Sequence, residues 1–240
     1  MLKKLLLDTL TLQLDATTAY RQEFTQRFFI RGPIRSLNIG SGGGIETLRL
    51  LRRGNHVTVV EIVKEVEART AARVQRNGFS ARYNGVVGHF MQVQLDGPFE
   101  QIVMCEVLEH ILDDRGAINK LASLLAPGGR LILSTPTNLY GQILDDSVSA
   151  SEDGGHVRVG YAGPELDLLL AEAGLLCLKR FYIVNEFLRT HIIVDRYLRH
   201  FVLTMPFAHL WSMCSRPFLP CLDLLKGRPY VQPTIATKLK

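Results

Sequence analysis

Hydrophobic and polar positions alternate along this chain with two different periods. Short apolar runs predict buried strands, whereas longer segments with apolar residues three or four positions apart predict amphipathic helices. The predicted strands cover 36–40, 56–62, 81–87, 99–105, 130–136 and 175–184, and the predicted helices cover 45–53, 63–77, 114–126 and 163–174, with a turn at 127–129. Because helices connect successive strands, the pattern predicts a doubly wound, mostly parallel α/β sheet.

The two ends of the chain extend this pattern. Residues 1–33 predict one or two N-terminal helices, and 34–184 hold the alternating core. Residues 185–229 predict amphipathic helices inserted before a final strand at 230–240, which would be the seventh strand and antiparallel to the others. Proline interrupts a strand ladder, so Pro233 is expected at the start of this strand. We expect one domain over 1–240.

Composition narrows the class of protein. Apolar residues make up 47% and charged residues 21% of the chain, which excludes a collagen-like or wholly disordered protein. The sequence has no run of about 18 uncharged apolar residues, so we expect no spanning helix, and its first residues do not read as a signal peptide. The four cysteines form no CxxC pair, which favours reduced thiols and a cytoplasmic location.

Charge is divided unevenly along the chain. Residues 179–240 contain ten Lys or Arg and three Asp or Glu, a net charge of +7, whereas the first 178 residues carry −2. Basic amphipathic helices are typical of binding to an anionic membrane surface. Residues 185–229 are therefore interpreted as a lid over a bulky apolar substrate with peripheral contact at the inner membrane surface, or else as a packing layer or dimer surface.

A glycine-rich segment, Gly40-Ser41-Gly42-Gly43-Gly44, follows the first predicted strand and precedes a helix. Glycines allow the backbone to approach a ligand closely, and the helix start offers free N–H groups. Glu61 ends the second strand 21 residues after Gly40, where a carboxylate can accept hydrogen bonds from both hydroxyls of a ribose. These residues predict a nucleotide-like ligand. The spacing is GxGxG, with Ile45 where the dinucleotide fingerprint has glycine or alanine, and no tyrosine has a lysine four residues later, which argues against a short-chain dehydrogenase.

Several motifs resemble those of one protein family, and they occur along the chain in the same order as in that family. LNIGSGGG, VVEI, FEQIVMCEVLEHI, LLAPGGRLILSTPT and HVRVGYAGPELDLLLAEAGL are similar to class I S-adenosylmethionine-dependent methyltransferases, in the branch of the ubiquinone-pathway O-methyltransferases and many small-molecule methyltransferases. The resemblance covers about residues 34–184. It implies S-adenosylmethionine as the cofactor and a seven-stranded Rossmann-like sheet. It also implies that Gly40, Ser41 and Gly42 surround the methionine part, that Glu61 holds the ribose and that His89 lies beside the adenine.

Two positions depart from the family pattern. Asn38 stands where an acidic residue is usual, and His89 stands where aspartate is usual. An asparagine can still anchor the glycine loop, and a histidine can still contact adenine through a ring nitrogen. The expected cofactor-binding residues are therefore Asn38, Gly40, Ser41, Gly42, Gly44, Glu61, Ile62, His89 and Glu106.

The residues after the fourth strand are candidates for chemistry on the methyl acceptor. If a helical turn starts at Glu106, then Glu106, Glu109 and His110 share one face, where two carboxylates and an imidazole could bind a divalent ion. An ExxEH element is associated with metal binding in the ubiquinone-pathway O-methyltransferases and in the small-RNA 2′-O-methyltransferases, and His156 is placed like a further histidine of the RNA enzymes. The resemblance thus implies a Mg or Mn site at Glu106, Glu109, His110 and His156. The alternatives are direct base catalysis by His110, with Glu109 and His156, and simple lining of the pocket.

The sequence is therefore interpreted as an S-adenosylmethionine-dependent methyltransferase. The expected reaction is O-methylation of a hydrophobic small molecule, a lipid-linked intermediate or a glycan precursor. The alternatives are a non-catalytic cofactor-binding scaffold, a peripheral membrane module and an RNA 2′-O-methyltransferase. The basic C-terminal part is rich in leucine and phenylalanine and lacks a recognised RNA motif, which argues against nucleic acid.

Overall fold

The computed structural model describes residues 16–140, 148–152, 154–185, 205–225 and 227–239, with the single positions 188, 190, 191, 193, 194, 197 and 198. Seven strands form one sheet in the order β3-β2-β1-β4-β5-β7-β6. The strands are β1 (Arg35–Ile39), β2 (His56–Glu61), β3 (Tyr83–Val87), β4 (Phe99–Cys105), β5 (Leu125–Pro136), β6 (Leu175–Arg180) and β7 (Val231–Lys238). All neighbours are parallel except β7, which is antiparallel to both β5 and β6. The predicted sheet is confirmed.

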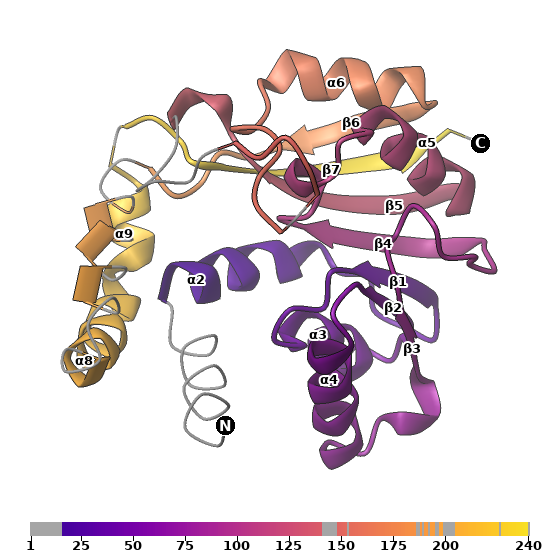
Figure 1. The fold of residues 1–240 in the computed structure, drawn as a ribbon, viewed down its shortest axis with the longest axis horizontal. Coiled ribbons are helices and arrows are strands. Elements are labelled where there is room, and N and C mark those ends of the chain that lie inside the picture. The colour runs from indigo at the N-terminus through magenta and orange to yellow at the C-terminus, as the bar shows by residue number, and fades with distance from the viewer. Residues whose placement is uncertain are drawn as a thin grey trace.

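Helices cover both faces of the sheet because its strands are apolar on both sides. Alternate strand residues enter two separate cores: Leu131 and Leu133 belong to one, and Ile132 belongs to the other. The first core packs against α5 (Asp114–Leu124) and α6 (Gly163–Glu172), and the second packs against α3 (Ile45–Arg52) and α4 (Lys64–Arg76). Figure 1 shows these two pairs of helices on opposite sides of the strands.

The order of the strands reverses between β1 and β4, since β2 and β3 lie on one side of β1 while β4 and β5 lie on the other. In doubly wound sheets, ligands bind outside the carboxyl ends of the strands at this switch point. The glycine loop after β1 and the segment after β4 both lie there. The fold therefore brings the two candidate regions of the sequence to one edge of the sheet.

Some predicted boundaries are wrong. The predicted turn at 127–129 lies inside β5, where the pairing with β4 shifts register between Phe99 and Gln101, so the extra residues form an irregularity within the strand. β6 ends at Arg180 rather than at residue 184. Pro233 is the third residue of β7 rather than its first, and its carbonyl accepts from the N–H of Phe181 at 2.8 Å. The N–H that proline lacks would face the same neighbour, just beyond the end of β6.

Three further helices lie beyond the core: α2 (Ala16–Thr25), α8 (Met205–Ser215) and α9 (Leu219–Asp223). α2 contacts both α8 and α9, and all three lie toward the same end of the sheet in Figure 1. The hydroxyl of Tyr20 on α2 donates to Asp223 on α9 at 2.8 Å. The part of the N-terminal prediction that falls on residues 1–15 lies outside the described residues, as does much of 186–204. Among the described residues, none of the helices combines the length and apolar character needed to span a bilayer.

Candidate functional site

The glycine loop joins β1 to α3 at the switch point. Gly40, Gly42 and Gly44 all have positive φ (75°, 47° and 73°), a region that side chains disfavour. A Cβ on Gly40 would lie 2.5 Å from a methyl carbon of Val107, in the segment after β4. Only glycine therefore allows these two segments to approach each other, and the loop presents backbone to the space between them.

Buried polar groups hold the loop in place. Ser41 donates to the Glu61 carboxylate at 3.0 Å, and the N–H of Gly42 donates to the same oxygen at 3.2 Å. The buried Asn38 side chain donates to the Thr47 hydroxyl of α3 at 3.0 Å. Asn38 thus ties the strand before the loop to the helix after it, which is the anchoring expected for this residue. Glu61 ties the end of β2 to the middle of the loop.

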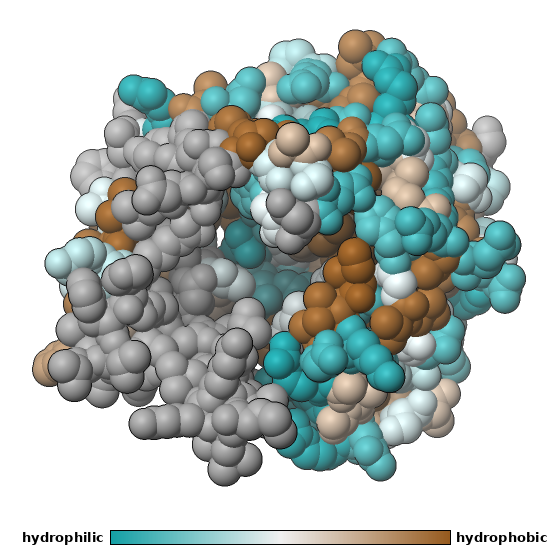
Figure 2. Space-filling model, viewed as in Figure 1, coloured by the Kyte–Doolittle hydropathy of each residue, from teal (hydrophilic) through white to brown (hydrophobic). Residues whose placement is uncertain are grey.

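A cavity of about 250 Å³ opens between the glycine loop, the end of β2 and the segment after β4. Four of the predicted cofactor residues line it: Gly40, Glu61, Ile62 and His89. Val107, His110 and Glu152 line it as well. The other predicted cofactor residues, Asn38, Ser41, Gly42, Gly44 and Glu106, do not line this cavity. Figure 2 shows that the face viewed in Figure 1 is hollowed near its centre, with hydrophobic and hydrophilic side chains around the hollow.

His89 contacts a residue that the sequence analysis missed. Its Nε2 lies 2.8 Å from Oε2 of Glu152, and its Nδ1 accepts from the N–H of Met91 at 3.3 Å. Glu152 belongs to the loop before α6 and is 63 positions away in the chain. No local pattern in the sequence relates the two residues, because their contact depends on how that loop folds over the sheet edge.

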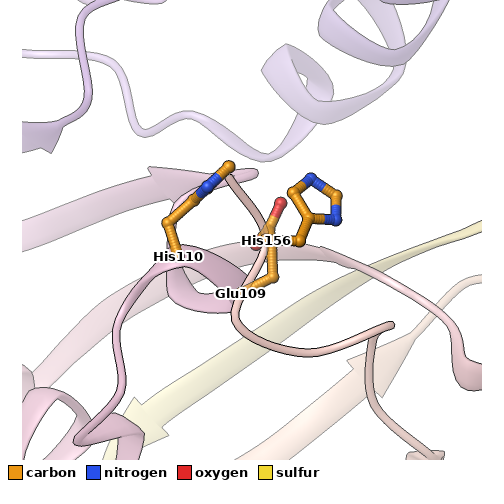
Figure 3. A group of neighbouring side chains, drawn as sticks. All are labelled: Glu109, His110 and His156. Carbon is orange, nitrogen blue, oxygen red and sulfur yellow. The ribbon is translucent and has the colours of Figure 1, made fainter. Parts of the chain in front are cut away.

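Beside the cavity, Glu109, His110 and His156 come together (Figure 3). One ligand atom from each of the three lies within 4.8 Å of the others, and the two imidazole rings meet edge to face with centroids 4.6 Å apart. Glu109 and His110 lie in a 3₁₀ turn, Leu108–His110, and His156 comes from the same loop as Glu152. The N–H of Val157 donates to the Glu109 carbonyl at 2.9 Å, which fixes the loop against this turn.

The Glu109 carboxyl group is fully buried, and neither of its oxygens has a hydrogen-bond partner among the described residues. Burial raises the pKa of Glu109 well above its usual value, and the negative charge of Glu106 raises it further. His110 Nδ1 lies 2.9 Å from the carbonyl oxygen of Gly155. A carbonyl only accepts, so this contact assigns the proton of neutral His110 to Nδ1 and leaves Nε2 with a lone pair. Glu109 thus offers a carboxyl group and His110 a basic nitrogen for chemistry.

Glu106 does not share a helical face with Glu109 and His110. It precedes the turn with a positive φ of 53°, which is unusual for a residue other than glycine. Ser134 on β5 donates to its carboxylate at 2.7 Å, and Arg21 on α2 forms an ion pair with it at 3.2 Å. The group of potential metal ligands among the described residues contains Glu109, His110 and His156 but not Glu106. The helical turn assumed from the sequence is therefore wrong, because the chain bends at Glu106 before the 3₁₀ turn begins.

A second network, also missed from the sequence, fastens the loop that holds His156. Arg158 forms an ion pair with Asp114 on α5 and donates to the carbonyls of Ile111 and Leu112. The buried Tyr161 donates to the same Asp114 carboxylate at 3.1 Å. This network fixes the end of the loop and thereby the position of His156.

Comparison with known proteins identifies the fold and the family. Residues 13–179 match the family model described as a methyltransferase domain. The chain is 30% identical over 122 residues to the ubiquinone biosynthesis O-methyltransferase of Xylella fastidiosa (strain M23), which is 51% of this chain and 50% of that protein. It therefore spans about half the length of the curated relatives that it matches.

Two solved structures show the same fold. The N-methyltransferase NodS of Bradyrhizobium japonicum, in complex with S-adenosylhomocysteine, superposes with a TM-score of 0.54 and 22% identity, over 68% of this chain and 78% of that one. The [4+2]-cyclase SpnF superposes with a TM-score of 0.65 and 18% identity, over 92% of this chain and 80% of that one. The predicted resemblance is confirmed: the chain belongs to the methyltransferase-domain family and has the class I methyltransferase fold.

Proposed function

We propose that this protein transfers a methyl group from S-adenosylmethionine to an oxygen of a hydrophobic small molecule. The family match and the similarity to an O-methyltransferase support the reaction. The observation that supports the cofactor most directly is the cavity, because Gly40 and Glu61 line it together and a side chain at position 40 would close the approach to Val107. In this proposal the Glu61 carboxylate would accept from ribose hydroxyls, and the backbone of the glycine loop would hold the amino-acid part.

Methyl transfer to a hydroxyl needs positioning and removal of one proton. When bound, S-adenosylmethionine supplies an electrophilic methyl group on a sulfonium. The acceptor oxygen would bond to this carbon as the carbon–sulfur bond breaks, and the electron pair of that bond would stay on sulfur. His110 Nε2 takes the hydroxyl proton, since Nδ1 is held by Gly155 and His110 lines the cavity. The proposed acceptor is a lipid-linked intermediate, a glycan precursor or another apolar molecule.

Glu109, His110 and His156 also fit a divalent cation. The buried carboxyl without a partner and the two neighbouring imidazoles are a typical donor set, and mixed nitrogen and oxygen ligands suit Mn better than Mg. When bound, such a cation lowers the pKa of a coordinated hydroxyl and orients adjacent oxygens. The protein would then hold the acceptor through the cation rather than through His110 alone.

A labelled methyl donor tests the proposal. Protein incubated with S-adenosylmethionine labelled in the methyl group and a lipid extract should yield a labelled, organic-soluble product that is detected by mass spectrometry. The double variant Glu109→Gln/His110→Ala should lower turnover by roughly 10²-fold or more. His56→Ala, an exposed histidine at the other end of β2, serves as the control and should leave turnover unchanged. The absence of labelled product from every fraction would contradict the proposal.

Turnover in the presence of a chelator distinguishes base catalysis by His110 from catalysis with a bound divalent cation. Loss of turnover in excess chelator and its recovery with Mn would support the cation. Full turnover in chelator would refute the cation and leave His110 as the base.

We also propose that the acceptor is taken up at an anionic membrane surface through 185–229. The supporting observation is a set of exposed apolar side chains within the segment of net charge +7, namely Phe207, Leu210 and Trp211 on α8 with Phe218 and Leu224 near α9. The full chain should float with vesicles rich in phosphatidylglycerol but not with phosphatidylcholine vesicles. Phe207→Ser/Leu210→Ser should abolish flotation, while Leu168→Ser, which changes an exposed leucine on α6, should not. Equal flotation of both variants would refute the contact.

A further inference from the structure

The cavity that lies beside the glycine loop is closed on one side by a loop from a distant part of the chain. Glu152 of this loop lines the cavity together with Ile62, Gly88 and His89. Ile62 follows β2, and Gly88 and His89 follow β3, which lies on the side of β2 away from β1. A base that extends toward β3 from a ribose held by Glu61 would reach these residues. A purine placed there would have the apolar Ile62 beside it and polar groups at its edge.

Hydrogen bonds fix the roles of these polar groups. His89 Nδ1 accepts from the N–H of Met91, so the proton of neutral His89 is assigned to Nε2, which donates to Glu152. Both ring nitrogens of His89 are therefore already engaged within the protein. The expected direct contact between a His89 nitrogen and adenine does not fit this arrangement.

Glu152 still has acceptor capacity. Its Oε2 accepts from His89 at 2.8 Å, and its Oε1 accepts from the N–H of Leu112 at 2.5 Å. Each carboxylate oxygen can accept a second hydrogen bond, and the side chain remains partly exposed to the cavity. His110 also lines the cavity, but its Nδ1 is held by the Gly155 carbonyl and its Nε2 is assigned to the acceptor in the proposed mechanism. Among the described side chains that line the cavity, Glu152 is thus the acceptor best placed for a donor on the edge of the base.

The 6-amino group of adenine is such a donor. We propose that Glu152 recognises this amino group and that His89 is a positioning residue, which holds the carboxylate by donating from Nε2. This inference rests on the proposed cofactor. It assigns the recognition of the base to a side chain from the loop before α6 rather than to the residue that follows Gly88.

Two ligands that differ at this one group test the assignment. S-adenosylhomocysteine has an amino group at position 6 of the purine, and S-inosylhomocysteine has a carbonyl oxygen there. A carboxylate attracts the first and repels the second, so the unaltered protein should bind the adenosyl compound roughly tenfold or more tightly in isothermal calorimetry. Equal affinity for the two compounds would overturn the inference. Failure to bind either compound would instead refute the proposed cofactor.

A substitution at Glu152 tests whether this side chain is responsible for the preference between the two ligands. Glu152→Gln keeps a single acceptor oxygen, which can hold only one of the contacts with His89 and Leu112, and it replaces the other oxygen with an amide donor. An amide donor no longer favours the 6-amino group over a carbonyl, so this variant should lose most of the preference for the adenosyl compound. Glu65→Gln, an exposed carboxylate on α4 outside the cavity, is the matched control and should keep the full preference. Retention of the full preference by Glu152→Gln would overturn the inference.

The role of His89 predicts a graded result. His89→Gln keeps a donor for Glu152 and should retain more of the preference than His89→Phe, which keeps the volume but has no donor. If His89→Phe discriminates between the two ligands as well as the unaltered protein does, the positioning role is refuted. Thermal unfolding of each variant shows whether a change in affinity comes from loss of the fold.

Discussion

Gly40 and Gly42 adopt left-handed backbone conformations in very different surroundings. A Cβ at Gly40 would collide with Val107, whereas a Cβ at Gly42 would meet no atom within 4 Å. Alanine at either position requires a positive φ that costs roughly 1–2 kcal/mol. Only at Gly40 is a steric clash added to this backbone cost.

We therefore expect Gly40→Ala to weaken binding of S-adenosylhomocysteine more than Gly42→Ala does. The strain of Gly42→Ala is present with and without ligand, so it should lower stability and leave affinity nearly unchanged, whereas Gly40→Ala displaces Val107, which lines the cavity, and should weaken binding. Isothermal calorimetry measures both affinities. Val107→Ala in the Gly40→Ala background should recover part of the difference, and a double variant no better than Gly40→Ala would show that the clash is not the cause.

Glu46, in the first turn of α3, is a buried carboxyl whose charge is costly. Burial raises its pKa, although Arg21, Arg49 and a hydrogen bond from Gln22 oppose the shift. Because the folded-state pKa is higher than that of the unfolded chain, about 4.3, the contribution of this group to stability is complete below that value and is lost as pH rises through the folded-state pKa. Glu46→Gln should thus raise the melting temperature at pH 7.5 and should not do so at pH 4. Circular dichroism at the two pH values tests this, and the same shift at both would contradict it.

At the scale of single residues, the sequence predicted relations between residues that lie close together along the chain. Gly40 and Glu61 were predicted to lie together because a loop and the next strand end have a known relation in this fold, and both line the same cavity. Glu152 and Arg21 were missed because each reaches the site from an element whose position depends on packing. Glu106 was placed wrongly because its positive φ cannot be read from residue type.

Two helices from opposite ends of the chain are linked at the element scale. Asp223 at the end of α9 accepts from Tyr20 on α2 and from the N–H groups of Val184 and Asn185 after β6. One carboxylate thus joins α2, α9 and the chain leaving the sheet. The apolar side chains of Ile183, Val184, Leu188, Leu219 and Val231 form a small core beside it.

Substituting Tyr20 and substituting Asp223 should lower the free energy of unfolding by different amounts. Tyr20→Phe deletes one hydrogen bond and should cost about 1 kcal/mol of the free energy of unfolding. Asp223→Ala also leaves two backbone N–H groups without their acceptor and should cost roughly 2–3 kcal/mol. Urea unfolding measures both, and equal losses would show that the backbone contacts contribute nothing.

Helices and strands were predicted well where the spacing of apolar residues determines them, as in the seven strands and the helices α3 to α6. Their ends were predicted less well. The irregularity inside β5 looked like a turn because Pro127-Gly128-Gly129 has turn composition. The segment stays in the strand because the residues on either side of it are paired, Leu125 with Phe99 and Arg130 with Gln101 and Thr237. Pro233 is tolerated inside β7 because the N–H that it lacks faces the less regular segment just after β6, where pairing continues only through Phe181 and the isolated bridge from Ile183 to Val231. This position depends on the partner segment rather than on the proline.

At the scale of the whole molecule, net charge is separated between the near-neutral core and the basic C-terminal part. Surface charges are screened beyond about 10 Å at 0.1 M salt. If the +7 segment attracts anionic vesicles, raising the salt concentration should weaken the association even though the exposed apolar side chains are unchanged.

Trp211 provides the readout because it is the only tryptophan in the chain and is 40% exposed on α8. Its ring stacks on His191 with centroids 5.2 Å apart. Anionic vesicles should shift its emission to shorter wavelength at low salt, and about 0.5 M salt should reverse much of the shift. Neutral vesicles serve as the control. An emission spectrum unaffected by either vesicle would contradict the proposed membrane contact.

Two described residues of the loop before α6 lie near the proposed places of the two reactants: Glu152 lines the cavity beside His89, and His156 lies beside Glu109 and His110. Displacing this loop to let one compound leave would therefore disturb the environment of the other. Steady-state kinetics should consequently be sequential with a compulsory order: the nucleoside enters first and departs last, so that S-adenosylhomocysteine competes with S-adenosylmethionine but not with the acceptor.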